Sequence, residues 1–131
     1  MPSANLAGSQ EVAGAAARAA ADKQAEDIVV LDVHELIVIT DFFVICTGMS
    51  DRQVKTVVEE VEKALRTLGH KPVRREGEHE SRWVLLDYVD VVVHVFAEDE
   101  RGFYDLERLW RDAPHVGWDE DGVSASVASL D

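Results

Sequence analysis

Cysteine, basic residues and long hydrophobic stretches are all scarce in this sequence. Its single cysteine, Cys46, excludes an intrachain disulfide framework and disfavours a cysteine-based zinc site. No stretch approaches the ~18 uninterrupted apolar residues of a membrane-spanning helix. The N-terminal region lacks the charged and apolar segments of a secretory signal, and residues 1–21 hold only Arg18, too little basic charge for a transit peptide. We therefore expect a soluble protein of the cytoplasm that does not enter a membrane.

Acidic residues outnumber basic ones by two to one. The 131 residues include 13 Lys and Arg against 26 Asp and Glu, which gives a formal net charge of −13. Without a basic cluster the chain has few groups for phosphate contacts, so we expect no direct sequence-specific binding of nucleic acid. The charge suits a basic protein partner or serves solubility alone. Hydrophobic residues, at 47%, are enough to bury the core of one domain.

The first third of the chain predicts an arm, a helix and two strands. Residues 1–12 are small and polar, and we expect a flexible N-terminal arm there. Residues 13–27 are rich in alanine, which favours a helix but buries little surface, so we expect this helix to pack loosely. The apolar, β-branched runs over 28–33 and 42–47 are typical of buried strands.

The clearest predicted element is a helix over 51–68. Ser50, followed three residues later by Gln53, forms a capping-box pattern at its start. Gly69 stands where a helix C-terminus favours a positive φ, and Pro72 prevents the helix from resuming. Apolar residues recur on one face of this helix at Val54, Val57, Val58, Val61, Leu65 and Leu68.

Three further strands and a helix complete the prediction. The runs over 72–75, 82–88 and 90–96 read as strands, and the last is apolar on both faces, as in a central strand covered on both sides. A helix over 102–111 ends before Pro114. Strands that alternate with helices predict an α/β fold, with a mixed sheet of about five strands flanked by helices.

These elements define the expected domain organisation. One domain spans residues 13–112, between the arm over 1–12 and an acidic tail over 113–131 that we expect to be disordered.

Two constellations could carry enzymatic chemistry, and each has a simpler structural interpretation. Gly48 and Ser50 mark a helix N-terminus that could receive a phosphate, but a plain helix cap also explains Ser50. Asp87 and Asp90 flank a tight turn and could hold a divalent cation, although aspartate is common in turns and carboxylates so placed generally diverge. A metal-dependent nucleotidyl- or phosphotransferase using Ser50, Asp87 and Asp90 is therefore the alternative hypothesis. We expect a protein that is not an enzyme and has no cofactor or metal.

The five histidines do not change this expectation. None has the spacing of metal ligands, and the sequence shows no recognisable Ser/His/Asp or Cys/His catalytic arrangement. His94, in the middle of an apolar strand, is better explained as a core histidine with its hydrogen bonds satisfied than as a ligand or base.

Trp83 is the strongest candidate for a binding residue. On the predicted strand, Trp83, Leu85 and Asp87 point to one side and Tyr88 to the other. The preceding segment over 76–82 is charged and mostly acidic. A large aromatic beside such a segment is typical of a protein-binding hot spot with a polar rim, and an ordinary core tryptophan is the competing interpretation.

Several motifs in this order resemble the ribosomal silencing factor family, also called the Iojap family. The resemblance covers about residues 13–111. It is carried by Leu31-Asp32-Val33, Ile39-Thr40-Asp41-Phe42, Ile45-Cys46-Thr47-Gly48 with Ser50 and Arg52, Glu76-Gly77-Glu78, Trp83, Asp87, Asp90-Val91-Val92-Val93-His94-Val95-Phe96 and Tyr104-Asp105-Leu106-Glu107-Arg108-Leu109-Trp110.

The resemblance implies a repressor of translation. Family members bind the large ribosomal subunit through its protein L-fourteen and sterically block joining of the small subunit, notably when nutrients are limiting. They have a fold similar to nucleotidyltransferases without an intact active site, and they have been described as homodimers. The family's exposed tryptophan, here Trp83, and its neighbouring strand contact the ribosomal protein. The predicted protein-binding site therefore comprises Trp83, Glu76, Leu85, Asp87, Tyr88 and Asp90.

Overall fold

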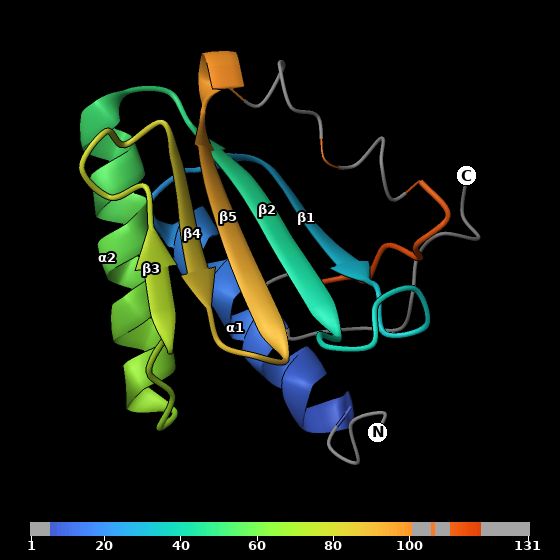
Figure 1. Cartoon of the computed structure of the whole chain (residues 1–131). Coiled ribbons are helices and arrows are strands. Elements are labelled where there is room, and N and C mark those ends of the chain that lie inside the picture. Colours follow the sequence, from blue (N-terminus) through green and yellow to red (C-terminus); the bar gives the residue numbers. More distant parts are fainter. Residues whose placement is uncertain (1–5, 101–105, 107–110, 119–131) are drawn as a thin grey trace.

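A computed structural model describes residues 6–100, Leu106 and residues 111–118 of the chain (Figure 1). Within these residues, two long helices and five strands are complete, and residues 98–100 add a short helical turn directly after the last strand. In chain order they are α1 (Leu6–Asp22), β1 (Glu26–Asp32), β2 (Phe42–Gly48), α2 (Asp51–Thr67), β3 (Arg74–Glu76), β4 (Trp83–Asp87) and β5 (Val91–Ala97).

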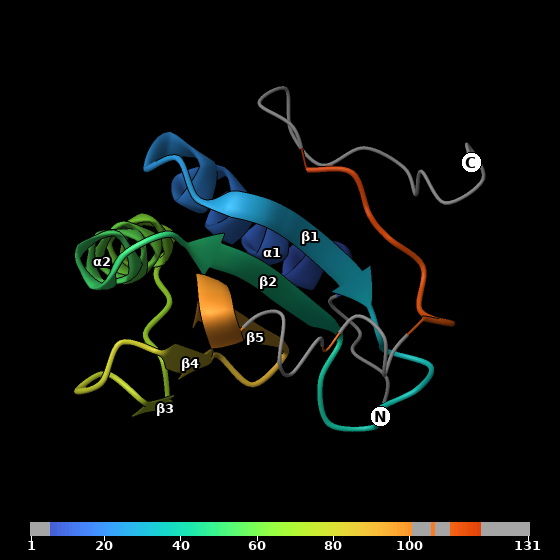
Figure 2. The same ribbon diagram turned by 90° about the horizontal axis from the view of Figure 1, so that it is seen from above.

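The strands form one mixed sheet in the order β1-β2-β5-β4-β3. Strands β2 and β5 run parallel, and the other three neighbouring pairs are antiparallel. Both helices lie on the same side of the sheet (Figure 2). The predicted α/β fold with a mixed five-stranded sheet is therefore confirmed.

Helix α2 forms where the sequence predicts it. The Ser50 side chain accepts a hydrogen bond from the backbone N–H of Gln53 at 3.1 Å, as an N-cap does. The Gln53 side chain in turn donates to the carbonyl oxygens of Lys23 and Gln24, which ties the start of α2 to the turn after α1. The valines of its apolar face and Leu65 are buried against the sheet.

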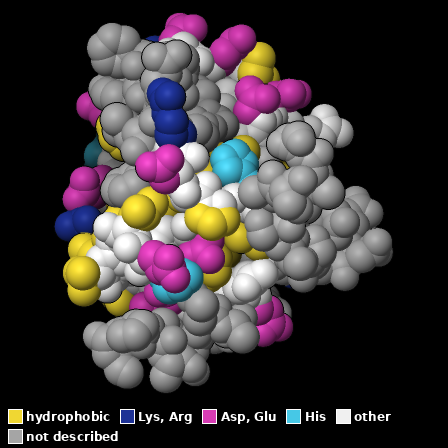
Figure 3. All heavy atoms as spheres, turned by 90° about the vertical axis from the view of Figure 1, so that its right-hand side faces the viewer, with side chains coloured by type: hydrophobic (Ala, Val, Ile, Leu, Met, Phe, Trp, Pro, Cys, Tyr) yellow, Lys and Arg dark blue, Asp and Glu magenta, His cyan; other side chains and the backbone are white. Residues whose placement is uncertain are grey.

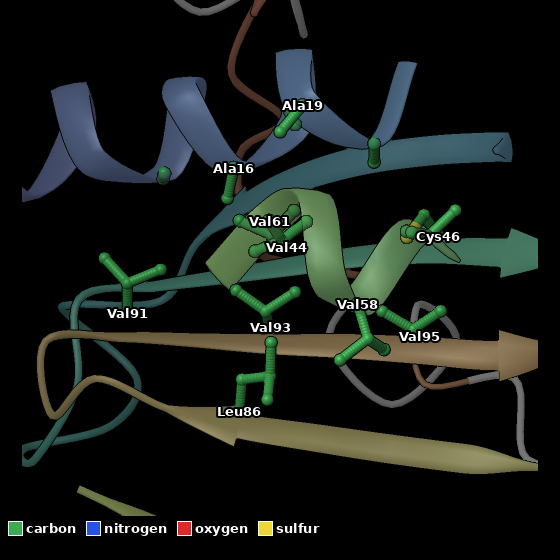
Figure 4. Close-up of a cluster of buried hydrophobic side chains, with 14 of the residues drawn as sticks. Ala16, Ala19, Val44, Cys46, Val58, Val61, Leu86, Val91, Val93 and Val95 are labelled. Carbon is green, nitrogen blue, oxygen red and sulfur yellow. The ribbon is translucent and has the colours of Figure 1, made fainter. Parts of the chain in front are cut away.

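Helix α1 differs from the prediction in both position and packing. It begins at Leu6, so the flexible arm predicted over 1–12 does not extend past residue 5, and it ends at Asp22 rather than 27. Ala13, Ala16 and Ala17 are fully buried, so the prediction of loose packing was wrong. Small side chains let a helix approach its neighbours closely, and the alanines of α1 lie directly above the valines of β2 and β5 (Figure 4).

The segment over 113–118 also differs from the disordered tail predicted to begin at residue 113. The backbone N–H of Asp32 donates to the Pro114 carbonyl at 2.8 Å, and that of Val116 donates to the Val30 carbonyl at 2.9 Å. Trp118 donates from Nε1 to the carbonyl of Ile28 at 3.3 Å. These bonds satisfy the outer edge of β1, which would otherwise present unpaired backbone groups.

Two further expectations from the sequence concern the last helix and a membrane-spanning helix. The helix predicted over 102–111 lies outside the described residues except for Leu106 and Arg111. Within the described part of the chain, no helix is both long and apolar enough to cross a membrane.

Candidate functional site

The two faces of the sheet have different surroundings. Alternate residues of each strand point to opposite faces, and α1 and α2 cover one of them. We call the opposite side the outer face. Leu106 packs on part of it, over a second buried cluster that includes Leu31, Ile45 and Phe96. The strand register places eight residues of β3, β4 and β5 together on the outer face: Arg74, Glu76, Trp83, Leu85, Asp87, Val92, His94 and Phe96.

Trp83 is held on the outer face by two neighbours from β5. Its ring stacks on Phe96, with centroids 5.0 Å apart and an interplanar angle of 27°. Its Nε1–H donates to Nδ1 of His94 at 3.1 Å. The side chain is half-buried, so Trp83 is both packed against the sheet and accessible to solvent. The packing of Trp83 agrees in part with the core interpretation, and its exposed part leaves the hot-spot interpretation a prediction.

His94 is the buried partner of this arrangement, so its predicted core position is confirmed, whereas its predicted full set of hydrogen bonds is met by the described residues only at Nδ1. It is 4% exposed, and burial lowers its pKa to about 4, so the ring is neutral near pH 7. Because Nδ1 accepts from Trp83, we assign the ring proton to Nε2. No residue in the described part of the chain accepts from Nε2, and the ring of Phe43 lies edge-on at a centroid distance of 4.9 Å. The histidine thus fixes the orientation of the indole.

Asp87 and Glu76 are joined through Arg74. The guanidinium of Arg74 lies 3.3 Å from Glu76 (Nε to Oε2) and 3.4 Å from Asp87 (Nη2 to Oδ2). Asp87 Oδ1 also accepts from the backbone N–H of Val89 at 2.8 Å, which confirms the interpretation of Asp87 as a turn residue. Val89 has a φ of 74°, a conformation that is strained for a β-branched residue.

The turn before β4 fits closely against the backbone of Trp83. Gly77 has a φ of 83°, and a Cβ placed there would lie 1.9 Å from the Trp83 carbonyl oxygen. Only glycine can occupy this position without displacing the start of β4. The turn that carries the acidic segment therefore packs directly against the backbone of β4.

Two predicted site residues lie elsewhere. Tyr88 and Asp90 line a separate hollow of about 300 Å³ beside the first turns of α1, with Val12 among its walls. Burial raises the pKa of Tyr88 to about 12, and burial together with the Asp41 carboxylate raises the pKa of Asp90. The structure therefore places Tyr88 and Asp90 apart from Trp83, since strand alternation turns Tyr88 to the helix side and Asp90 lines the same hollow.

The geometry does not assemble the alternative nucleotidyl- or phosphotransferase site. Ser50 follows the end of β2, where Gly48 pairs with Ala97, whereas Asp90 precedes β5 at the opposite end of the same strand pair. Ser50 is engaged as a helix cap. Among the described residues, no group of three or more His, Cys, Asp or Glu side chains could hold a metal ion.

The sequence reasoning missed three neighbours of the predicted site residues. Phe96, Arg74 and His94 reach Trp83 or Asp87 only through the cross-strand register. Turn signals and alternation predict which side each residue faces, but not which residues become neighbours.

The fold and its outer face therefore define a class of structure: an α/β domain with a mixed five-stranded sheet, helices on one side, and a half-buried tryptophan among ion pairs on the other. The surrounding ion pairs and the separation of Ser50 from Asp90 favour a contact surface over a reaction centre.

Comparison with known proteins identifies the family. The family model described as "Ribosomal silencing factor during starvation" matches residues 7–130. The chain is 47% identical over 107 residues to the ribosomal silencing factor RsfS of Halalkalibacterium halodurans, covering 82% of this chain and 92% of that protein. It is 48% identical over 99 residues to the protein of that name from Bacillus subtilis, with coverage of 76% and 84%. A crystal structure of a Chromobacterium violaceum protein, 39% identical, matches with a TM-score of 0.75 over 77% of this chain and 84% of that one. The chain belongs to the ribosomal silencing factor family, as the resemblance predicted.

Proposed function

We propose that this protein binds the large ribosomal subunit in the cytoplasm through ribosomal protein L-fourteen and sterically blocks joining of the small subunit. The resulting repression of translation would matter most when nutrients are limiting. Family membership supports a role at the ribosome, and the observation that carries the contact site is the half-buried Trp83 fixed on the outer face by His94 and Phe96.

The contact surface consists of Trp83, Leu85, Asp87 and Glu76, which we call the Trp83 patch. Aromatic residues in the centre of a patch with a polar rim carry most of the binding energy in protein interfaces. The net charge of −13 favours a basic ribosomal protein as the direct partner and speeds its association, whereas direct binding to ribosomal RNA is disfavoured.

Co-sedimentation with purified large subunits tests this proposal. We expect Trp83→Ala to raise the Kd about 30-fold, which corresponds to about 2 kcal/mol, because truncation removes the central aromatic of the patch. In a subunit-joining assay, the wild-type protein should reduce the yield of joined ribosomes and Trp83→Ala should not.

Trp118→Ala is the matched control for this experiment. Trp118 is also half-buried and its indole N–H is also hydrogen-bonded, but it packs beside β1 away from the Trp83 patch. We expect Trp118→Ala to bind large subunits like the wild type at temperatures where it is folded. Equal binding by wild type and Trp83→Ala would show that the contact site is wrong, and failure of the wild type to co-sediment would refute ribosome binding.

The homodimer implied by the family resemblance is a separate proposal. Sedimentation equilibrium over a range of protein concentrations measures it directly, and a single species at the 14.5 kDa mass of one chain would exclude it.

A further inference from the structure

A groove lies next to the Trp83 patch on the outer face. It has a volume of about 360 Å³, within the range of about 300–1,000 Å³ that is typical of ligand pockets. Its floor comes from β2, β4 and β5, and its wall comes from the loop over 33–41 that joins β1 to β2. The lining is mostly apolar and includes Ile37, Ile39, Phe43, Leu85, Val92 and His94.

The groove is continuous with the Trp83 patch. Leu85 belongs to both, and His94 lines the groove while its Nδ1 holds the indole of Trp83. A partner that covers the tryptophan therefore reaches the groove without leaving the sheet surface.

The loop that forms the wall exposes large apolar side chains. Leu36, Val38 and Ile39 are 48%, 89% and 78% exposed. Apolar side chains grouped in this way on a surface mark sites of interaction more often than isolated ones do. Hydrophobic side chains with acidic ones among them gather on this side of the molecule (Figure 3).

The loop is fixed at both ends, so this exposure is a property of a defined conformation. The backbone N–H of Val33 donates to the Asp41 carbonyl at 2.8 Å and closes the base of the loop. Ile37 donates back to Val33 in a helical turn, and Asp41 donates to the carbonyl of Asp90, each at 2.8 Å. These bonds hold the wall of the groove in place against the start of β5.

The side chains around the groove indicate which kind of partner side chain fits it. Asp87 is the acidic residue among its lining residues, and the one basic residue there, Arg74, lies 3.4 Å from Asp87 and 3.3 Å from Glu76. Thr40 lines the groove as well, and no described residue hydrogen-bonds to its buried Oγ1. An apolar floor with the Asp87 carboxylate at its rim, on a chain with a net charge of −13, suits an apolar side chain flanked by a basic one.

We propose that this groove receives an apolar side chain of the ribosomal protein, with an adjacent Lys or Arg placed at the acidic rim. The inference rests on the proposed function and extends its contact surface from β4 to the loop over 33–41. Burial of the exposed Ile39 against the partner supplies apolar contact area, and the Asp87 carboxylate orients the basic neighbour.

The test compares Ile39→Asp with Met49→Asp in binding to purified large subunits and to isolated ribosomal protein L-fourteen. Met49 is 50% exposed and lies past the opposite end of β2, so the control adds the same charge to an exposed apolar position outside the groove. Because both side chains are exposed, we expect both variants to fold, which circular dichroism and thermal unfolding check. We expect Ile39→Asp to raise the Kd at least tenfold and Met49→Asp to change it less than twofold.

The remaining outcomes would overturn the inference in distinguishable ways. If Ile39→Asp binds like the wild type while Trp83→Ala is impaired, the groove has no part in an otherwise correct site. If the wild type fails to bind, the proposed function is refuted. The proposed binding of a ribosomal-protein side chain in the groove is then refuted as well. If Ile39→Asp disperses a dimer but leaves ribosome binding unchanged, the groove takes a second copy of this chain.

Discussion

At the scale of single residues, the outer face depends on a buried histidine that is neutral near pH 7. Burial depresses the pKa of His94 to about 4, below its ordinary value of 6.5. His34, on the loop over 33–41, has the opposite behaviour, because its hydrogen bond to Asp32 raises its pKa. The two histidines therefore affect stability in different pH windows, since His94 titrates below pH 6.5 and His34 above it.

The first prediction concerns His94 and acid stability. Between pH 6.5 and about 4 the unfolded chain takes up a proton at this position and the folded chain does not, so stability is retained above pH 6.5 and lost as the pH falls. The loss attributable to His94 is on the order of 3 kcal/mol. We expect the variant His94→Gln, which keeps an acceptor for Trp83 but cannot titrate, to lack this component. Urea unfolding at pH 7 and pH 4 measures it, and parallel pH profiles for the two proteins would contradict the assignment.

At the scale of elements, α1 shows how an alanine-rich sequence builds a closely packed helix. Ala16 and Ala20 are fully buried, and Ser9 and Val12 extend the buried side toward the N-terminus. An alanine contributes little apolar area by itself, but it leaves no room for a larger side chain between the helix and the sheet. The helix is therefore sensitive to added volume.

The second prediction tests this sensitivity with Ala16→Leu. We expect a loss of about 1–3 kcal/mol in the free energy of unfolding, because the added atoms must displace packed neighbours. Ala21→Leu is the control, since Ala21 lies in the same helix but is only partly buried. Equal unfolding midpoints in urea for the two variants would mean that α1 packs as loosely as its composition alone suggests.

How much could be predicted from the sequence differed from element to element. The helical spacing of Val54, Val57 and Val61 was sufficient to predict α2, because the apolar face and the N-terminal cap indicate the same helix. The start of α1 was missed because the residues around Ser9 are small and polar and have no apolar period that would predict a helix. In the structure they lie beside the hollow that Tyr88 also lines, a contact between distant segments that the local sequence does not reveal.

For the candidate site, the residues that share one face of a strand could be predicted, but their neighbours on the next strand could not. Alternation correctly grouped Trp83, Leu85 and Asp87, which follow from one strand alone. The bond between Trp83 and His94 joins residues 11 positions apart, and it exists because β4 and β5 pair with Leu85 opposite His94. Register of this kind depends on the turn between the strands, where Val89 adopts a positive φ that its residue type does not favour.

At the scale of the whole molecule, both edges of the sheet are protected in different ways. β3 is a three-residue edge strand whose side chains are charged and exposed. β1 is instead covered by the segment over 113–118, in which Ala113 and Val116 are buried. Short charged strands and covering segments are two ways in which proteins prevent edge-to-edge association.

The third prediction concerns the covering segment. We expect truncation after residue 112 to lower the free energy of unfolding by about 2 kcal/mol or more, because a buried valine and the hydrogen bonds to β1 are lost. Exposure of the β1 edge should also cause self-association that increases with concentration. Truncation after residue 118 keeps these contacts and is the control. Thermal unfolding and light scattering after size exclusion measure both effects, and identical behaviour of the two truncated chains would contradict the role of the segment.

The fixed position of Trp83 has a consequence for affinity. A side chain that becomes immobilised on binding typically costs about 0.5–1.5 kcal/mol in lost conformational entropy. In this chain the indole is already held by His94 and Phe96, so that loss occurs during folding and not when the partner arrives. A buried histidine can therefore strengthen the binding of a partner, because it narrows the conformations that Trp83 adopts in the unbound protein.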